Sequence, residues 1–130
     1  MASIFTKIVN GEIPCYKIAE DHEFMAFLDV NPLAKGHTLV IPKEEVDYLF
    51  DIDDEKLATM IVFAKRLATG IRTVVPCTKV GMSVVGLEVP HAHIHLIPIN
   101  SVSDMNFARP KIKLDKEEMI ALADAISRVV

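Results

Sequence analysis

The chain has 130 residues, a size typical of one compact domain, and its 51% hydrophobic content excludes disorder caused by a lack of core-forming side chains. The net charge is -4 without a dense run of Lys and Arg, which argues against a nucleic-acid partner but is compatible with a small anionic ligand. No apolar run could span a bilayer and the first residues lack a signal-peptide pattern, so we expect a cytoplasmic protein without membrane contact.

Two strands are predicted in the first third of the chain, after a tight turn at Asn10-Gly11. Residues 23–30 alternate strictly between two faces, as in a strand. One face carries Phe24, Ala26 and Leu28, and the other carries Met25, Phe27 and Asp29. Residues 37–42 are rich in β-branched side chains and predict a second strand, closed by Pro42.

From Asp53 the pattern changes to that of a helix, because apolar residues recur at intervals of three and four. The acidic residues 51–55 precede basic residues further along, so they are most simply a helix N-terminus that complements the backbone dipole, not a metal site. The apolar positions are Leu57, Ile61, Ala64, Leu67 or Ala68, and Ile71.

The second half of the chain predicts two more strands, at residues 78–86 and 87–99, and a final helix. Asp115 can cap that helix, and Glu118 completes a capping-box-like pair. Its apolar stripe is typical of a core or oligomer contact and consists of Met119, Leu122, Ala123, Ile126 and Val129. Strands joined by turns, with helices at mid-chain and at the end, indicate an α+β fold with an antiparallel sheet.

Three of the five histidines occupy alternate positions in the segment VPHAHIHLIPI, residues 89–99. On a strand, His91, His93 and His95 would share one face, with neighbouring histidines about 7 Å apart and the outer two about 13 Å apart. A metal ion holds its nitrogen ligands at about 2 Å, so it could bind two neighbours but hardly all three. One ring could instead attack a substrate while the others hold or protonate it, because imidazole titrates at about pH 6.5.

A purely structural role for this row is disfavoured, because an apolar strand face has no use for three polar rings. His37 begins the 37–42 segment and would join the row only if the two strands pair. His22 lies in a charged turn, and we expect it to be solvated.

The segment HAHIHLIP, residues 91–98, resembles the His-x-His-x-His motif of the histidine triad (HIT) family of nucleotide hydrolases and transferases. Residues 3–14 and 27–43 resemble two further blocks of that family, so the resemblance covers roughly residues 3–100. The similarity is greatest to the Hint-like branch, whose members act on purine nucleoside phosphoramidates and related mononucleotide esters. It implies a five-stranded antiparallel sheet, usually in a homodimer. We expect a single HIT domain over 1–130, with a C-terminal helical extension at about 114–130.

The resemblance also implies a covalent mechanism that needs no cofactor. His93, the middle histidine, would attack the α-phosphorus and form a nucleotidyl-histidine intermediate, which water resolves to a nucleoside monophosphate. His95 would contact the phosphate or the leaving group, and His91 and His37 would complete the cluster that orients His93. A nitrogen nucleophile divides one displacement at phosphorus into two easier ones, and neighbouring donors stabilise charge on the phosphoryl oxygens.

A nucleoside pocket is implied by position. Asp29 matches the acid that accepts hydrogen bonds from the two ribose hydroxyls. Six apolar residues match the positions that sandwich the base, although the sequence pattern alone would assign Ile8 and Phe27 to the core. They are Ile4, Phe5, Ile8, Ile13, Phe27 and Val30.

The first departure from the family pattern concerns metal. Many bacterial members bind a structural zinc ion through Cys-x-x-Cys in the first block and a histidine after the second. Ser3, Thr6 and Glu45 occupy those places in this chain. Because Ser and Thr are poor zinc ligands and three ligands are lost together, we expect no bound metal.

The second departure lies just before the triad, where the family often has Gly-Gln-Ser/Thr-Val and uses polar groups on the phosphate. This chain keeps Gly86 but has Leu87 and Glu88. A carboxylate beside a phosphate would repel it unless it is protonated or turned away. Glu88 could instead receive a cationic leaving amine.

Three functions therefore compete. The first is a nucleotide phosphoramidase or hydrolase of the histidine triad type. The second is a metal-dependent hydrolase that uses His91 and His93 with another ligand. The third is a nucleotide-binding or interaction protein whose turnover is weak or lost because of Glu88.

Overall fold

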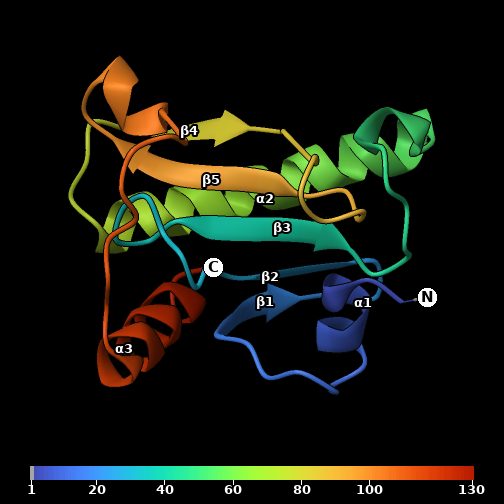
Figure 1. The fold of residues 1–130 in the computed structure, drawn as a ribbon, viewed down its shortest axis with the longest axis horizontal. Coiled ribbons are helices and arrows are strands. Elements are labelled where there is room, and N and C mark those ends of the chain that lie inside the picture. Colours follow the sequence, from blue (N-terminus) through green and yellow to red (C-terminus); the bar gives the residue numbers. More distant parts are fainter. Residues whose placement is uncertain (1) are drawn as a thin grey trace.

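The computed structural model describes residues 2–130 and contains an antiparallel sheet of five strands (Figure 1). The strands are β1 (Lys17–Glu20), β2 (Phe24–Leu28), β3 (Thr38–Pro42), β4 (Lys79–Ser83) and β5 (Ile94–Ile99). Their order across the sheet is β1-β2-β3-β5-β4. The expected α+β fold with a five-stranded antiparallel sheet is confirmed.

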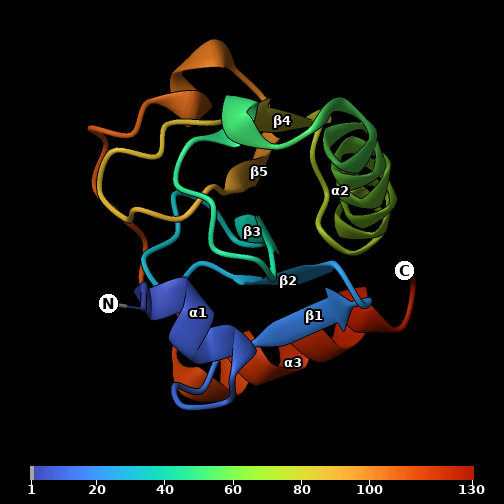
Figure 2. The same ribbon diagram turned by 90° about the vertical axis from the view of Figure 1, so that its right-hand side faces the viewer.

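Three α-helices and two short 3-10 helices accompany the sheet within the described residues. They are α1 (Ile4–Val9), η1 (Leu49–Asp51), α2 (Asp54–Val74), η2 (Val102–Met105) and α3 (Lys116–Ser127). Helices α2 and α3 cover one face of the sheet, while α1 and the long loops lie on the other (Figure 2). No helix within residues 2–130 is long and apolar enough to cross a membrane.

Strand β2 separates two clusters of buried side chains, as its alternating sequence predicts. One face contributes Phe24, Ala26 and Leu28 to the large core that α2 and α3 complete. The other face contributes to a smaller cluster on the α1 side. That cluster consists of Phe5, Met25, Phe27, Leu39 and Ile41. A cavity lies over this second face, and Phe5, Phe27 and Leu39 are part of its lining.

Both long helices begin where the sequence predicts. The Asp53 carboxylate accepts a hydrogen bond from the backbone N–H of Lys56 at 2.9 Å, and the Asp115 carboxylate accepts one from Glu118 at 2.8 Å. Four of the five predicted stripe residues of α3 are buried in the large core, so the stripe is a core contact. Val129 is the exception, because it lies beyond the end of α3 and is 47% exposed.

Two short elements, α1 and β1, were not evident from the sequence pattern. Helix α1 has six residues, too few for an apolar repeat to emerge, and its cap is Ser3, whose Oγ accepts from the N–H of Thr6 at 3.0 Å. Strand β1 has four residues, and a register shift between Lys17 and Ala19 interrupts its pairing with β2. Short, irregular elements of this kind have too little periodicity to predict.

The last strand is shorter than predicted. Strand β5 begins at Ile94, so His91 and His93 lie in the preceding loop and only His95 belongs to the strand. The chain bends there: the N–H of His91 donates to the carbonyl of Val89 at 2.8 Å, next to Pro90, which has no N–H to donate. The expectation of three histidines in one row on a strand is therefore wrong.

The turn that delivers His37 to the cavity depends on Gly36. Its φ is 96°, and a Cβ would lie 3.0 Å from Val75 Cγ2 and 3.3 Å from Pro98 Cγ. We expect Gly36→Ala to lower the free energy of unfolding by about 2 to 4 kcal/mol, because left-handed backbone and crowding both disfavour the added carbon. Urea unfolding followed by circular dichroism measures the loss.

Gly11→Ala is the matched control. Gly11 has a φ of 78°, but nothing lies within 4 Å of its Cβ position, so we expect only the backbone cost of about 1 kcal/mol. Equal losses in the two variants would show that Val75 and Pro98 yield freely to a side chain at Gly36.

Candidate functional site

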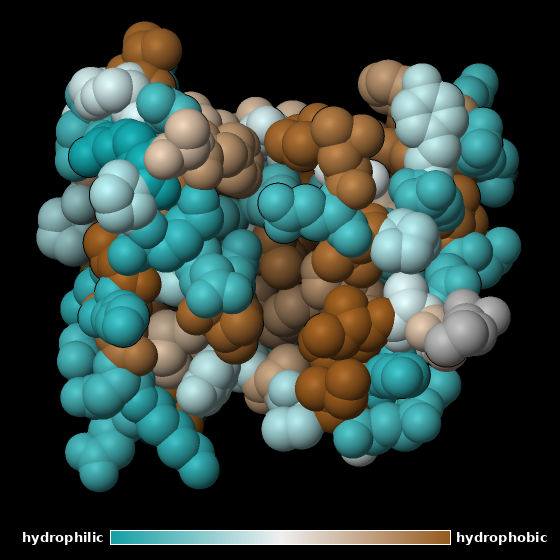
Figure 3. All heavy atoms as spheres, in the orientation of Figure 1, coloured by the Kyte–Doolittle hydropathy of each residue, from teal (hydrophilic) through white to brown (hydrophobic). Residues whose placement is uncertain are grey.

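A cavity of about 460 Å³ opens on the α1 face of the sheet. Its walls come from α1, the ends of β2 and β3, the loop before β5 and the segment after η2. In Figure 3 apolar side chains gather around a hollow in the middle of this face, with polar side chains outside it. Among the predicted catalytic residues, His37, His93 and His95 line the cavity, whereas His91 lies behind it.

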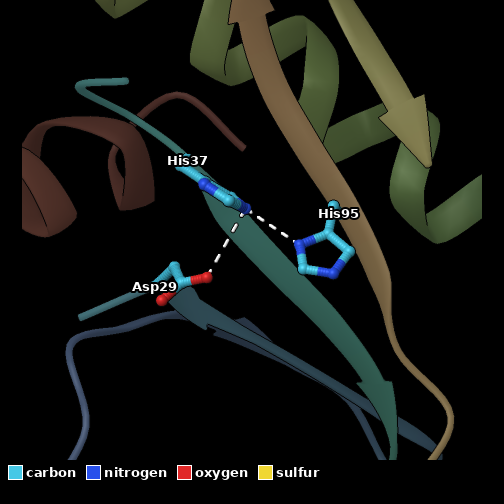
Figure 4. Close-up of side chains that lie close together, drawn as sticks. All are labelled: Asp29, His37 and His95. Carbon is cyan, nitrogen blue, oxygen red and sulfur yellow. Dashed lines mark hydrogen bonds and ion pairs between the residues drawn. The ribbon is translucent and has the colours of Figure 1, made fainter. Parts of the chain in front are cut away.

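Strand pairing brings His37 and His95 together from distant parts of the chain. Strand β3 runs antiparallel to β5 with Leu39 opposite His95, and His37 Nε2 lies 2.9 Å from His95 Nδ1 (Figure 4). Burial lowers the pKa of His37 to about 3 and that of His95 to about 4, so both rings are neutral at pH 7.

Hydrogen bonds assign the proton on each of these two rings. The backbone N–H of Leu33 donates to Nδ1 of His37 at 3.0 Å, so the neutral ring of His37 carries its proton on Nε2. That proton is donated to Nδ1 of His95. His95 in turn carries its proton on Nε2, which makes it a hydrogen-bond donor at the edge of the cavity.

Asp29 completes a compact group with His37 and His95, whose nearest nitrogen and oxygen atoms all lie within 4.8 Å of one another. Figure 4 shows the three side chains converging, with Asp29 Oδ2 3.5 Å from His37 Nε2. Burial raises the pKa of Asp29, and its Oδ1 accepts from the N–H of Asn31 at 2.8 Å. Because Leu33 donates to Nδ1 of His37, and Nε2 of His37 donates its proton to His95, the neutral ring of His37 has no lone pair to offer a metal ion in this arrangement.

His93 presents one free nitrogen to the cavity. Its Nδ1 lies 2.7 Å from the backbone carbonyl oxygen of His91, and a carbonyl can only accept, so Nδ1 donates. In the neutral ring the lone pair is then on Nε2. The rings of His93 and His95 are edge to face, with centroids 5.0 Å apart. The two rings therefore lie side by side, although only His95 belongs to β5.

His91 supports this arrangement from behind. It is fully buried, and its Nε2 donates to the carbonyl oxygen of Pro42, at the end of β3, at 2.8 Å. Its Nδ1 therefore accepts, and the hydroxyl of Ser3 lies 2.7 Å away. Both nitrogens of His91 are occupied, so the geometry opposes the hypothesis of a metal held by His91 and His93.

The three side chains at the expected zinc positions form a hydrogen-bonded network. Glu45 Oε1 accepts from the N–H of Ser3 at 2.6 Å and from the hydroxyl of Thr6 at 2.7 Å. Through Ser3 this network reaches His91, and through the carbonyl of His91 it reaches His93. These hydrogen bonds thereby connect Glu45 to α1, to the end of β3 and to the loop before β5.

The apolar residues predicted to hold a base lie together around the cavity with one exception. Ile4 and Val30 are 49% and 67% exposed at its mouth, and Phe5 and Phe27 are buried beneath them. Ile8 also lines the cavity. Ile13 does not, although its neighbours Pro14 and Cys15 do, so the prediction for Ile13 is wrong.

Glu88 lies where the family resemblance implies, on the cavity wall in the loop before β5. Its side chain is exposed, and its charge contributes to raising the pKa of Asp29. Two carboxylates, of Asp29 and Glu88, therefore face one cavity.

Two lining residues, Phe107 and Lys111, were not found from the sequence. They lie between η2 and α3, in a stretch without a periodic or motif signal. The Phe107 ring packs edge to face on His95 with centroids 4.8 Å apart, and on His37 at 6.4 Å. Only the tertiary structure shows that this stretch returns to the cavity.

The network around Glu45 predicts how stability changes with pH. Hydrogen bonds from Ser3 and Thr6 lower the pKa of Glu45 from 4.5 to about 2. Because the folded-state pKa is the lower one, the ionised carboxylate stabilises the fold fully above about pH 4.5, and this contribution is lost as the pH falls to about 2. We expect wild type to be more stable than Glu45→Gln at pH 7, with a difference that shrinks across this window.

Urea unfolding at a series of pH values measures this difference. Asp47→Asn controls for the loss of one surface charge, because Asp47 is exposed and its side chain forms no hydrogen bond or ion pair within residues 2–130. A stability difference for Glu45→Gln that stays constant from pH 7 to about pH 2 would contradict the role given to the ionised carboxylate.

Comparisons with known proteins identify the family of this chain. Residues 10–102 match the HIT domain. The adenosine 5'-monophosphoramidase of Schizosaccharomyces pombe is 37% identical over 130 residues, covering 98% of this chain and 97% of that protein. A Hit-like protein from Bartonella henselae superposes with a TM-score of 0.84 at 28% identity, covering 98% of this chain and 96% of the other. A zinc-bound histidine triad protein from Mycobacterium smegmatis reaches a TM-score of 0.81 at 28% identity, covering 98% and 95%. The chain belongs to the histidine triad (HIT) family.

Proposed function

We propose that this protein cleaves purine nucleoside phosphoramidates or related mononucleotide esters, with His93 as the nucleophile. The observation that supports this most directly is the hydrogen bond from His93 Nδ1 to the His91 carbonyl, because it leaves the Nε2 lone pair available in the cavity. Membership of the HIT family and similarity to a protein named adenosine 5'-monophosphoramidase support the reaction class.

The proposed reaction has two displacements at phosphorus. In the first, His93 Nε2 attacks the α-phosphorus, the bond to the leaving amine or alcohol breaks, and a nucleotidyl-His93 intermediate forms. His95, with its proton on Nε2, donates a hydrogen bond to a phosphoryl oxygen or to the leaving group. In the second, water attacks the phosphorus and the bond to His93 breaks, which releases a nucleoside monophosphate. His37 and His91 hold the other two rings in the required tautomers.

The nucleoside would bind at the α1 end of the cavity. Asp29 retains acceptor capacity for the two ribose hydroxyls, because Asn31 uses only one of its lone pairs. Ile4 and Val30 expose apolar surface at the mouth on which a purine can stack, above the buried rings of Phe5 and Phe27.

The proposal includes a cytoplasmic homodimer without bound metal. Strand β4 is an edge of the sheet, and Met82, Val84 and Val85 along and after it are 54%, 43% and 48% exposed. An open edge with exposed apolar side chains is suited to pairing with a second copy. The hydrogen bonds among Ser3, Thr6 and Glu45 support the expectation that no zinc is needed at their positions.

A second candidate, a nucleotide-binding protein with weak turnover, is favoured by Glu88. An ionised carboxylate on the cavity wall opposes an anionic substrate, and it does so without disturbing the ribose and base positions. AMP binding without turnover of adenosine phosphoramidate would identify this alternative.

The covalent mechanism predicts the effect of His93→Ala. We expect the variant to lose at least about a thousandfold in kcat for adenosine phosphoramidate, because no other ring offers a lone pair to the phosphorus, while AMP still binds. His22→Ala is the control, since that side chain is 87% exposed and lies outside the cavity. Mass spectrometry of wild type quenched during turnover should find one added nucleotidyl group, and near-normal turnover by His93→Ala would exclude this mechanism.

Kinetics of Glu88→Ser test the role of the second carboxylate. Two unit charges about 5 Å apart at an effective dielectric constant of about 20 repel by about 3 kcal/mol, and the exposure of Glu88 reduces this figure. We therefore expect a gain of roughly tenfold in kcat/KM for an ester-linked adenylate, smaller at high salt.

An amine-linked adenylate separates repulsion of the phosphate from attraction of the leaving group. If Glu88 receives a cationic amine, the same variant loses activity on that substrate alone. Unchanged kinetics on both substrates would show that Glu88 has neither role.

A further inference from the structure

Residues 106–114, which we call the strap, connect η2 to α3 and pass beside the loop between β2 and β3 (Figure 1). The backbone N–H of Ile112 donates to the carbonyl of Pro32 at 2.9 Å, which attaches the strap to that loop. Within the strap Arg109 forms an ion pair with Asp104 of η2 at 2.9 Å. Arg109 and Ile112 thus attach the strap to η2 and to the loop between β2 and β3, and the strap lies outside the stretch that matches the HIT domain.

The strap places one ring and one charge at the cavity. Phe107 covers the His37–His95 pair and shields it from water. Lys111 lines the cavity four residues later, and its Nζ donates to the carbonyl of Phe107 at 2.6 Å and to that of Arg109 at 3.4 Å. An ammonium group has three donors, so one is left for a ligand.

The charges around the cavity are unfavourable for an anion without this lysine. Asp29 and Glu88 contribute two carboxylates. His37 and His95 add no positive charge at pH 7, because burial keeps their pKa values at about 3 and about 4. Within residues 2–130, Lys111 is the sole Lys or Arg on the cavity wall. Its charge acts to lower the pKa values of Asp29, His37 and His95, which line the same cavity.

We propose that Lys111 is a substrate-binding residue that pairs with the anionic phosphate of the nucleotide. This inference rests on the proposed function. It adds a substrate-binding residue that lies outside residues 10–102, the stretch that matches the HIT domain. Lys111 offsets the two carboxylates, so that a nucleoside monophosphate can enter a cavity in which His37 and His95 are neutral. A charge-assisted hydrogen bond from the ammonium then orients the phosphorus toward His93.

Calorimetric titration with AMP and with adenosine, which lacks the phosphate, tests this assignment. We expect Lys111→Met to weaken AMP binding roughly tenfold, the effect of one hydrogen bond to a charged group, and to leave adenosine binding unchanged. Lys111→Arg should retain most of the AMP affinity. Lys113→Met is the matched control, because that exposed lysine lies in the same strap but outside the cavity. Added salt should weaken AMP binding to wild type more than to Lys111→Met.

Each contrary outcome has a separate meaning. An unchanged AMP affinity in Lys111→Met overturns the role of Lys111 and leaves the proposed function intact. Equal losses for AMP and adenosine also overturn it, since they show that the substitution disturbs the strap rather than a phosphate contact. Wild type that binds neither ligand overturns the proposed function itself.

Discussion

The hydrogen bond that His93 donates to the carbonyl oxygen of His91 is the contact on which the rest of the site depends. It requires the loop before β5 to hold one carbonyl in place, and that loop is held in turn by the buried ring of His91. His91 reaches the carbonyl of Pro42 on one side and the hydroxyl of Ser3 on the other. Elements from three parts of the chain therefore determine which nitrogen of His93 is free.

A second constraint is the burial of several polar rings in a small apolar setting. A buried imidazole without partners is costly, and each of these rings is hydrogen-bonded. The same burial keeps His37 and His95 neutral, which suits them for directional hydrogen bonds but deprives the cavity of positive charge. The role proposed for Lys111 is to supply a positive charge to this cavity from the strap.

Much of the fold follows from local patterns. The strict alternation of residues 23–30 gives β2 its two faces, and the capping carboxylates of Asp53 and Asp115 give α2 and α3 their starts. Helix α1 and strand β1 escape prediction because they are too short and irregular for a period to emerge. The bend before β5 could not be predicted either, because the alternation of His91, His93 and His95 is the same as in a continuous strand. The backbone hydrogen bond within the loop, which makes the bend, leaves no such pattern in the sequence.

The sequence by itself determined the family, the sheet and the identity of the triad, because side-chain spacing and short motifs are properties of neighbouring residues. It also placed Asp29 and Glu88 at the cavity through family resemblance. Only the tertiary structure decided the partners of each ring: His37 with His95, His91 with Ser3, and Glu45 with Thr6. The positions of Phe107 and Lys111 were decided in the same way. These contacts join residues far apart in the chain, and a local repeat or motif carries no information about which distant segments pack against each other.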